Sequence, residues 1–411
     1  MAPAPALGAS SRDVLRDREF RGLLLADGLS STGDQVARIA VSLLVLERSG
    51  SVFAASATYA CSYLSWLVGG PFLSGIADHH RRRSVMVVCD LLRMALVGVL
   101  VIPGTPLPVV FAVLAAIGLL APPFEAARSS LLADVLAGER YLVGNALMNA
   151  MTQAAQLVGF VGGGALVTVL DVEGALLANA ATFALSAALL VSHVTDRLHE
   201  VPAAPSGTSR VTEAVAGFSL LLRTPRLRLL LGWGLLSAAA VIAPEGLAVA
   251  VADEAGRGPL AAGVLTAAVP AGFLVGSWVV LRQPADRRER LFPVMVTASC
   301  LPLLLTAVVE DVVAITVLWV LAGVGNAMQL VANASFVQEV PSHLRGRAFG
   351  VAVTLLMAVQ GVLLLVAGAL AEVAGPRVPV AVVAGVALLL IPVLVAAGSS
   401  LDRAAPAVEA P

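Results

Sequence analysis

The chain of 411 residues is 58% hydrophobic and 13% charged, and its mean hydropathy is +0.91. A soluble globular domain is about half apolar and about a quarter charged, so this composition excludes that class. The net charge of −1 gives no basic footprint, and we expect no nucleic-acid partner. The three cysteines, Cys61, Cys89 and Cys300, are far apart in sequence, which excludes a CxxC metal or redox site.

Long apolar runs dominate the chain. About 20 apolar residues in a helix cross the hydrocarbon core of a bilayer, and charged or Pro/Gly-rich segments separate twelve runs of this kind. In chain order the predicted spans are 21–46, 53–77, 84–103, 106–132, 142–170, 174–194, 227–252, 259–281, 291–309, 312–337, 348–371 and 377–399. The sequence therefore predicts an all-α polytopic membrane protein with twelve transmembrane helices.

The start of the chain does not resemble a cleavable signal peptide. Residues 1–19 combine a Pro/Ala-rich tail with alternating charges, and the first apolar run is too long for a signal-peptide core. We expect this run to be a signal anchor and the first span.

Arginine placement predicts the orientation. The chain has no lysine, and if the N-terminus is cytoplasmic only Arg48, Arg257 and Arg377 fall in outer loops, while Arg38 and Arg93 fall within spans. All other arginines then lie on the cytoplasmic side, as the positive-inside rule requires. We expect a multi-pass protein of the bacterial cytoplasmic membrane with both termini in the cytoplasm.

The longest polar interruption divides six spans from six. It covers 195–226 and predicts a cytoplasmic linker between a six-helix half at 1–194 and a second half at 227–411, which ends in a short tail. The halves also echo each other at an offset of 205 positions, where Arg140 aligns with Arg345. Two pseudo-symmetric six-helix halves in parallel repeat are typical of one large class of secondary transporters.

The loop after the second span carries a recognisable signature. Ser74 to Arg83 resembles the loop motif of the major facilitator superfamily, in which a Gly is followed four residues later by Asp and then by a basic cluster. Asp78 and the arginines match this motif, while Ser74 stands where Gly is usual and His79 where Arg is usual.

Other segments resemble the drug:proton antiporter branch that includes macrolide-efflux and enterobactin-exporter proteins. They are Leu29 to Asp34, Cys89 to Arg93, Gln338 to Pro341 with Arg345 to Arg347, and Gly159 to Gly163, where Phe160 replaces the usual Pro. The resemblance implies a twelve-helix fold and transport driven by the proton gradient.

Ionisable groups inside spans are costly and usually face a cavity or one another. Asp34 and Arg38 are four residues apart and share a helix face, and Asp27 lies seven residues before Asp34 on the same face. Glu245 follows Pro244 in the seventh span, where proline frees backbone carbonyls. We interpret all four residues as candidates for proton coupling. The alternatives are a permanent Asp34–Arg38 ion pair, an Asp27 that is solvated or paired with a neighbouring helix, and a Glu245 at the outer mouth.

Amide side chains recur at helical spacing on two spans. Such stripes either bond to another helix or line a wet cavity. The candidates for a substrate cavity are Asn145, Asn149, Gln153 and Gln156 on the fifth span, Asn326, Gln329 and Asn333 on the tenth, and Gln360 on the eleventh.

Further charged groups gather near the cytoplasmic ends of the spans. The resemblance implies that this region forms a gate that closes the inner side and opens when the halves rock. The gate candidates are Asp78, Arg81, Arg82, Arg83, Asp90, Arg93, Glu125 and Arg128.

Motifs for enzymes and bound cofactors are missing from the sequence. There is no GxxxxGK[ST] phosphate loop, no HExxH and no GxSxG, so we expect no enzyme, no metal and no cofactor. The sequence predicts a monomeric secondary transporter whose partners are a small-molecule substrate and the bilayer. The favoured function is proton-coupled efflux of an amphipathic drug-like, macrolide-like or siderophore-like molecule by alternating access. A symporter that imports a metabolite and a lipid or lysolipid translocator are the alternatives.

Overall fold

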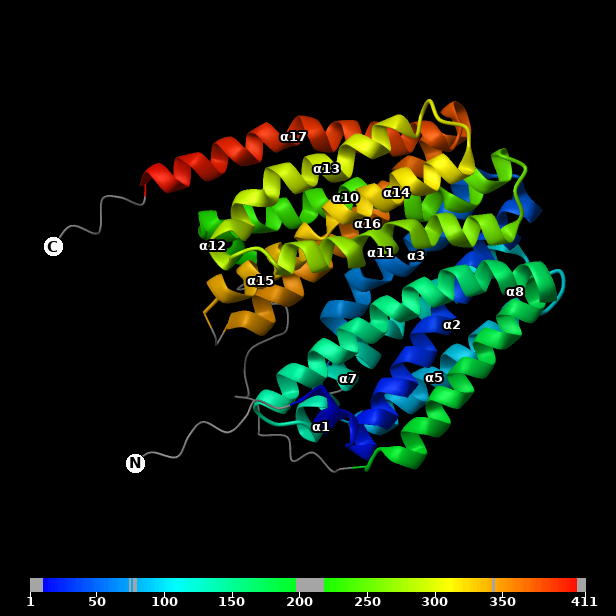
Figure 1. The fold of residues 1–411 in the computed structure, drawn as a ribbon. Coiled ribbons are helices and arrows are strands. Elements are labelled where there is room, and N and C mark those ends of the chain that lie inside the picture. The colour runs from blue at the N-terminus through cyan, green and yellow to red at the C-terminus, as the bar shows by residue number, and fades with distance from the viewer. Residues whose placement is uncertain (1–9, 74, 77–79, 197–217, 342–343, 405–411) are drawn as a thin grey trace, which may run out of the picture.

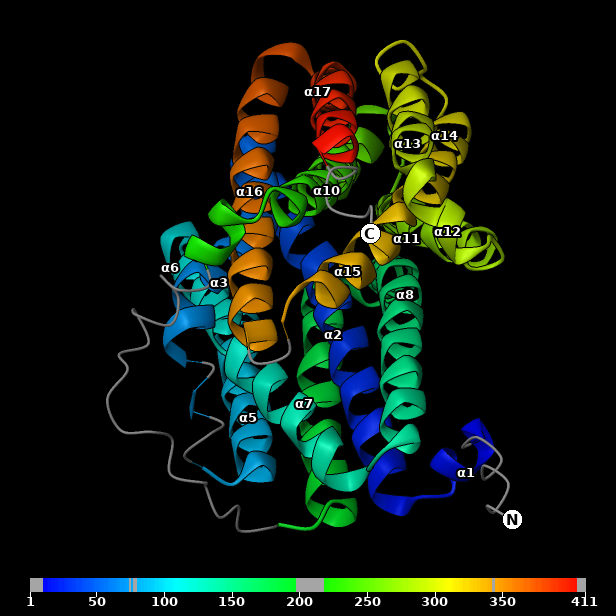
Figure 2. The same cartoon turned by 90° about the vertical axis from the view of Figure 1, so that its left-hand side faces the viewer.

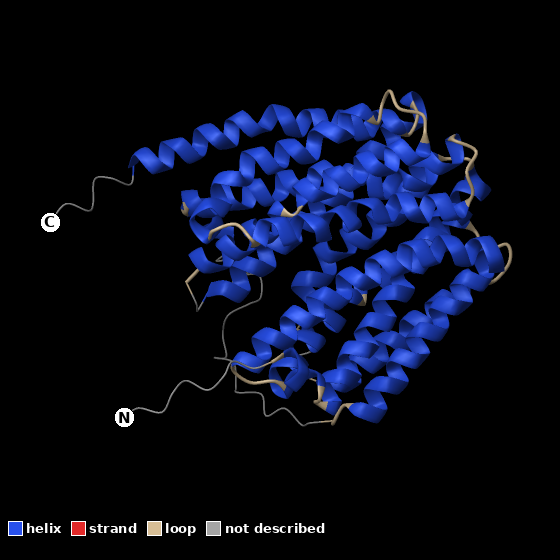
Figure 3. Ribbon diagram, in the orientation of Figure 1, coloured by secondary structure: helices blue, strands red, loops and turns tan. Residues whose placement is uncertain are grey.

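The computed structural model describes residues 10–73, 75–76, 80–196, 218–341 and 344–404. Within these ranges the chain forms helices and no strand (Figure 3). The predicted all-α class is therefore confirmed, and the predicted linker at 195–226 lies mostly outside the described residues.

The first half of the chain begins with a short helix and continues in long ones. They are α1 (Ser11–Leu15), α2 (Arg18–Ser49), α3 (Val52–Leu73), α5 (Arg82–Leu100), α6 (Leu107–Leu119), α7 (Ala121–Val135) and α8 (Glu139–His193). Helices α6 and α7 meet at Leu120 and together form the predicted fourth span. Helix α8 is interrupted at Asp171, whose φ is 61°, and thus provides the predicted fifth and sixth spans.

The second half of the chain repeats this pattern. Its helices are α10 (Pro225–Glu254), α11 (Pro259–Leu281), α12 (Ala285–Arg288), the 3-10 turn η1 (Glu289–Leu291), α13 (Phe292–Leu305), α14 (Val312–Asn326), α15 (Met328–Glu339), α16 (Arg345–Ala374) and α17 (Arg377–Ala404). Helices α14 and α15 follow each other as α6 and α7 do, and together they form the predicted tenth span.

Every predicted span coincides with a helix or a helix pair. Among the described residues, seven helical stretches are long and apolar enough to cross a membrane, and they contain eight of the predicted spans because α8 holds two. The other four predicted spans coincide with α2, α3, α5 and α13. We infer that these four helices also cross the membrane from their sequence pattern and from the fold.

The helices form two groups that meet along two seams. Figure 1 shows α2, α5, α7 and α8 in one group and α10, α13, α14 and α17 in the other. Helix α3 packs on α16 along one seam, and α8 packs on α11 along the other (Figures 1 and 2). At the second seam Gly263 lies against the backbone of Phe160, and Gly164 lies against that of Pro259. Small residues let the backbones of the two groups approach closely.

The two ends of the molecule differ in how the groups touch. Helix α1 and the last turns of α17 lie at one end, which we call the terminus end; the opposite end is the distal end (Figure 1). At the distal end the Glu372 carboxylate of α16 accepts hydrogen bonds from the Ser51 hydroxyl and from the Phe53 N–H at 2.9 Å. These bonds tie the start of α3 to the other group of helices. Towards the terminus end the ribbons of the two groups diverge (Figure 1).

Helices α11 and α14 approach each other through glycines. A Cβ on Gly272 would lie 1.9 Å from the Val320 carbonyl oxygen, so a side chain there must push the two backbones apart. We expect Gly272→Leu to lower the free energy of unfolding by roughly 1–3 kcal/mol or more through overpacking. The matched control is Gly234→Leu in α10, where a Cβ meets nothing within 4 Å. Equal thermal unfolding of the two purified variants would contradict this packing.

Candidate functional site

A row of charged residues runs along one face of α2. Asp27, Asp34 and Arg38 are separated by seven and four residues, as expected for one helix face. Each of them has its ion-pair partner on a different helix: Arg128 on α7, Arg93 on α5 and Glu245 on α10. The row thus contacts three helices from the terminus end to beyond the middle of α2.

Arg38 joins the two groups of helices. Its guanidinium lies 3.0 Å from the Glu245 carboxylate, and it also stacks over the Tyr63 ring at 5.6 Å from the ring centroid. The Tyr63 hydroxyl donates to both Glu245 oxygens, at 3.1 and 2.9 Å. Arg38 and Glu245 are partly buried, with side chains 28% and 23% exposed. The three residues come from α2, α3 and α10, so this cluster links the two halves.

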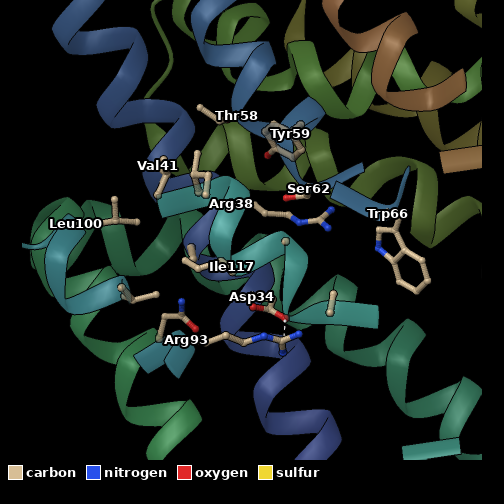
Figure 4. A pocket seen from close by; sticks show the side chains of 16 residues that line it. Asp34, Arg38, Val41, Thr58, Tyr59, Ser62, Trp66, Arg93, Leu100 and Ile117 are labelled. Carbon is tan, nitrogen blue, oxygen red and sulfur yellow. Dashed lines mark ion pairs between the residues drawn. The ribbon is translucent and has the colours of Figure 1, made fainter. Parts of the chain in front are cut away.

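Asp34 does not share an ion pair with Arg38. Its carboxylate lies 3.9 Å from the Arg93 guanidinium instead (Figure 4). The i, i+4 spacing had left an ion pair between Asp34 and Arg38 as an alternative. In the structure each charged residue of the row has its ion-pair partner on a neighbouring helix instead. Arg93 is held between the rings of Phe124 on α7 and Phe183 on α8, at 4.9 and 5.9 Å from their centroids.

Asp34, Arg38 and Arg93 line one cavity of about 90 Å³ (Figure 4). It lies among the helices of the first half, which supply both polar and apolar groups to its wall. The other lining residues are Ala37, Val41, Thr58, Tyr59, Ser62, Trp66, Val97, Leu100, Leu114, Ile117, Gly118, Ala121 and Asn179.

The sequence pattern did not identify several of these cavity residues. Arg93 was predicted as part of a gate, and Tyr59 and Trp66 lie in an apolar run without a motif. Asn179 gave a signal that was available, because it is the single amide of the sixth span.

The predicted gate residues near the terminus end form bonds within the first half. Arg128 donates to Asp27 at 3.1 Å and also to Glu125, and Asp27 is 1% exposed. Asp90 is fully buried and accepts hydrogen bonds from the hydroxyls of Ser30 and Ser186. These contacts fasten α2, α5, α7 and α8 to one another.

The loop arginines also bond within the first half. Arg81 and Arg83 lie 2.7 and 3.4 Å from the Asp196 carboxylate, and Arg82 pairs with Asp134. Asp78, the motif residue predicted to join them, lies outside the described residues. A gating role for these arginines stays a prediction, because the contacts named here join residues of the first half.

The predicted amide stripes have mixed surroundings. Asn326 is buried and accepts a hydrogen bond from Ser237 at 2.9 Å, which is a contact between α14 and α10. The others are exposed or half-buried, and none of the predicted amides lines the cavity beside Asp34. The exposed ones are Asn145, Asn149 and Asn333, and the half-buried ones are Gln153, Gln156, Gln329 and Gln360. A shared pathway along these amides stays a prediction.

Metal ligation finds no support in the geometry. In the part of the chain that the structure describes, no three His, Cys, Asp or Glu side chains gather so that they could hold a metal ion.

Comparison with known proteins identifies the family. Residues 23–355 match the sequence profile of the Major Facilitator Superfamily. The chain belongs to this superfamily. It is therefore a multi-pass membrane transporter and not an enzyme, as the sequence predicted.

Two relatives give different functional hints. The multidrug efflux pump Tap of Mycobacterium tuberculosis strain H37Rv is 28% identical over 374 residues, which are 86% of this chain and 87% of that protein. The lysophospholipid transporter LplT of Yersinia pestis strain Pestoides F is 30% identical over 161 residues, which are 38% of this chain and 39% of that protein. The similarity to an efflux pump agrees with the efflux branch that the motifs resemble.

Solved structures share the fold. A POT family transporter in complex with 5-aminolevulinic acid has a TM-score of 0.76 at 12% identity and covers 92% of this chain and 96% of its own. A mutant of the nucleoside transporter NupG has a TM-score of 0.72 at 13% identity, covering 92% and 99%. A bacterial homologue of the human lysosomal transporter Spinster, inward-facing and unoccupied, has a TM-score of 0.70 at 14% identity, covering 93% and 98%.

Proposed function

We propose that this protein exports an amphipathic small molecule, of the drug, macrolide-like or siderophore-like type, and that protons entering the cell drive the export. The observation that carries this proposal is the contact of Arg38 with Glu245 between the halves, next to a cavity that contains Asp34. Placing an ionised carboxylate at this depth in the membrane costs free energy. Such carboxylates therefore usually face a transport cavity or pair with a cation. The similarity to the efflux pump Tap over most of both chains supports the direction of transport.

The orientation of the chain in the membrane decides which side of the bilayer the two diverging halves face. We place the terminus end in the cytoplasm, because the arginine-rich segments lie there. The structure then corresponds to a state whose halves meet at the outer end through Glu372 and diverge towards the cytoplasm. An exporter takes up its substrate in such a state.

The ion pair between the halves provides a route to coupling. When the loaded transporter opens outwards, Glu245 separates from Arg38 and becomes accessible to an external proton. A protonated Glu245 carries no charge, so the empty transporter can pass through the intermediate between the two states without an unpaired buried carboxylate. Renewed contact with Arg38 releases the proton to the cytoplasm. Asp34 and Arg93 form a second carboxylate–guanidinium contact on the same path.

Inside-out membrane vesicles that contain the protein test this function. An acid interior is imposed and followed with a ΔpH-sensitive dye, while antibiotics, siderophores and dyes are added singly. We expect at least one amphipathic compound to dissipate the gradient, and to do so only in vesicles with the protein. If the inserted, folded protein responds to none of them, proton-coupled export of these classes is wrong.

Lysophospholipid translocation is the second candidate. The similarity to LplT over 161 residues and the apolar wall of the cavity favour it. Proteoliposomes that contain a fluorescent lysophospholipid separate the two candidates. Protein-dependent translocation without any proton gradient would favour this alternative over proton-driven export.

A further inference from the structure

Arg93 is a buried cation whose hydrogen-bonding capacity is largely unused. It is 4% exposed, and its Nε is buried without a hydrogen-bond partner. Its only ion-pair contact in the described part of the chain, with Asp34, is 3.9 Å long and therefore too long for a hydrogen bond. A buried guanidinium without acceptors costs free energy, so such an arrangement indicates a place for an acceptor that comes from outside the protein.

The unused donors of Arg93 are fixed in place. The rings of Phe124 and Phe183 flank the guanidinium, and these cation–π contacts hold it without using its N–H groups. The guanidinium of arginine is planar and presents paired donors that match the two oxygens of a carboxylate or a phosphate. Arg93 is therefore oriented in advance for an oxyanion.

Asn179 adds a second donor to the same cavity. It is 1% exposed and lines the cavity together with Arg93. Its side-chain oxygen lies 3.4 Å from the Thr182 hydroxyl, which leaves the NH₂ group as a donor. Asn179 is on α8 and Arg93 is on α5, so the two donors approach from different helices.

The lining contains two cationic side chains and one carboxylate. They are Arg38, Arg93 and Asp34, and Arg93 is the cation whose carboxylate partner lies too far away for a hydrogen bond. Glu245, the partner of Arg38, is not part of the lining. The wall beyond the polar groups is apolar and includes Val97, Leu100 and others.

Size limits what enters. A site that encloses a drug-sized ligand has about 300–1,000 Å³, whereas this cavity has about 90 Å³. The cavity accommodates only one end of such a molecule, and the remainder has to extend beyond it. An oxyanion followed by a few methylenes fits both the donors and the apolar wall.

We propose that Arg93 and Asn179 form the subsite that binds the oxyanion end, a carboxylate or a phosphate ester, of the amphipath that this protein transports. This inference rests on the proposed export for its physiological meaning, but the subsite itself is a matter of binding. When one monoanion leaves the cell and one proton enters, each movement transfers one positive charge inward, so two positive charges move inward per cycle. Such export is therefore accelerated by an inside-negative membrane potential as well as by the pH gradient.

Binding to the full chain in lipid nanodiscs tests the subsite without transport. The probe is radiolabelled decanoate, and the competitors are unlabelled decanoate, decanoyl lysophosphatidylglycerol, inorganic phosphate, decyltrimethylammonium and decanol. We expect saturable binding that Arg93→Gln weakens about tenfold or more, which corresponds to one charge-assisted hydrogen bond of about 1.4 kcal/mol. Arg93→Lys keeps the charge and part of the affinity. Arg48→Gln is the matched control and should keep full affinity. Among the described residues, Arg48 bonds only the Thr105 carbonyl.

The competitors identify the source of the oxyanion and the outcomes that overturn the subsite. Displacement by decanoate alone indicates a soluble acid, whereas displacement by the lysolipid as well indicates a lipid headgroup. Equal displacement by decyltrimethylammonium or decanol overturns the proposal, and so does unchanged affinity in Arg93→Gln. If Arg93→Gln is not monodisperse in size-exclusion chromatography, Asn179→Ala replaces it and has to weaken binding. If the unmodified protein binds decanoate but shows no proton-driven export, the proposed function is wrong and the subsite stands.

Discussion

Glu245→Gln is expected to open the distal end of the transporter. The substitution removes the negative charge that Arg38 contacts at 3.0 Å and leaves the guanidinium without its counter-ion. Breaking a fully buried pair costs about 3–5 kcal/mol, and roughly half of that remains here because both side chains are about a quarter exposed. The contact exists only while the halves meet, so its loss shifts the population towards the outward-open state by roughly tenfold or more.

Cysteine labelling measures this shift. Ser56 is fully buried at the seam and donates to the Leu364 carbonyl at 2.8 Å across it. In a background without the native cysteines, Ser56→Cys should react slowly with a membrane-impermeant maleimide in intact cells. Glu245→Gln should make that reaction about tenfold faster and should strongly reduce proton-driven export.

Glu254→Gln is the matched control for this prediction. Glu254 ends the same helix and also pairs with an arginine, Arg377, but the Glu254 side chain is 39% exposed and the contact lies within the second half. Exposed pairs contribute about 0–1 kcal/mol, so labelling of Ser56→Cys should change little. Equal labelling rates in Glu245→Gln and Glu254→Gln would show that Arg38 and Glu245 do not hold the halves together.

Periodicity and hydropathy predicted the spans because helix geometry and membrane thickness are local constraints. The same local reasoning placed Asp34 and Arg38 on one face of α2, and the structure does so too. It could not supply their partners, since Arg93 and Glu245 are brought to them by the packing of distant helices. Sequence spacing therefore identifies residues that share a face, while ion pairs between helices depend on the tertiary arrangement.

The assignment of Arg93 illustrates the same limit. Its position three residues after Asp90 suggested a local network near the membrane surface. In the structure Asp90 bonds two serines, while Arg93 extends between two aromatic rings towards Asp34. Neither ring lies near Arg93 in sequence, so spacing alone could not separate a gate residue from a cavity residue.

Asp34→Asn is expected to uncouple transport from the proton gradient. Asn has nearly the same shape as Asp but carries neither a charge nor a titratable proton, so the cavity keeps its volume. If Asp34 binds and releases a proton in addition to Glu245, export driven by an imposed pH gradient should fall by roughly 100-fold in this variant, as for loss of an essential proton carrier. Substrate exchange between two equal pools needs no net proton movement and should persist.

Vesicle assays under two conditions separate these effects. The first condition imposes an acid interior and measures substrate accumulation; the second has no gradient and measures exchange of labelled for unlabelled substrate. Asp134→Asn is the control, because Asp134 pairs with Arg82 at the terminus end of the first half and does not line the cavity. Loss of both activities in Asp34→Asn would assign Asp34 to substrate binding or folding. Retention of both would show that Glu245, the other acid in contact with an arginine of this site, carries the proton without Asp34.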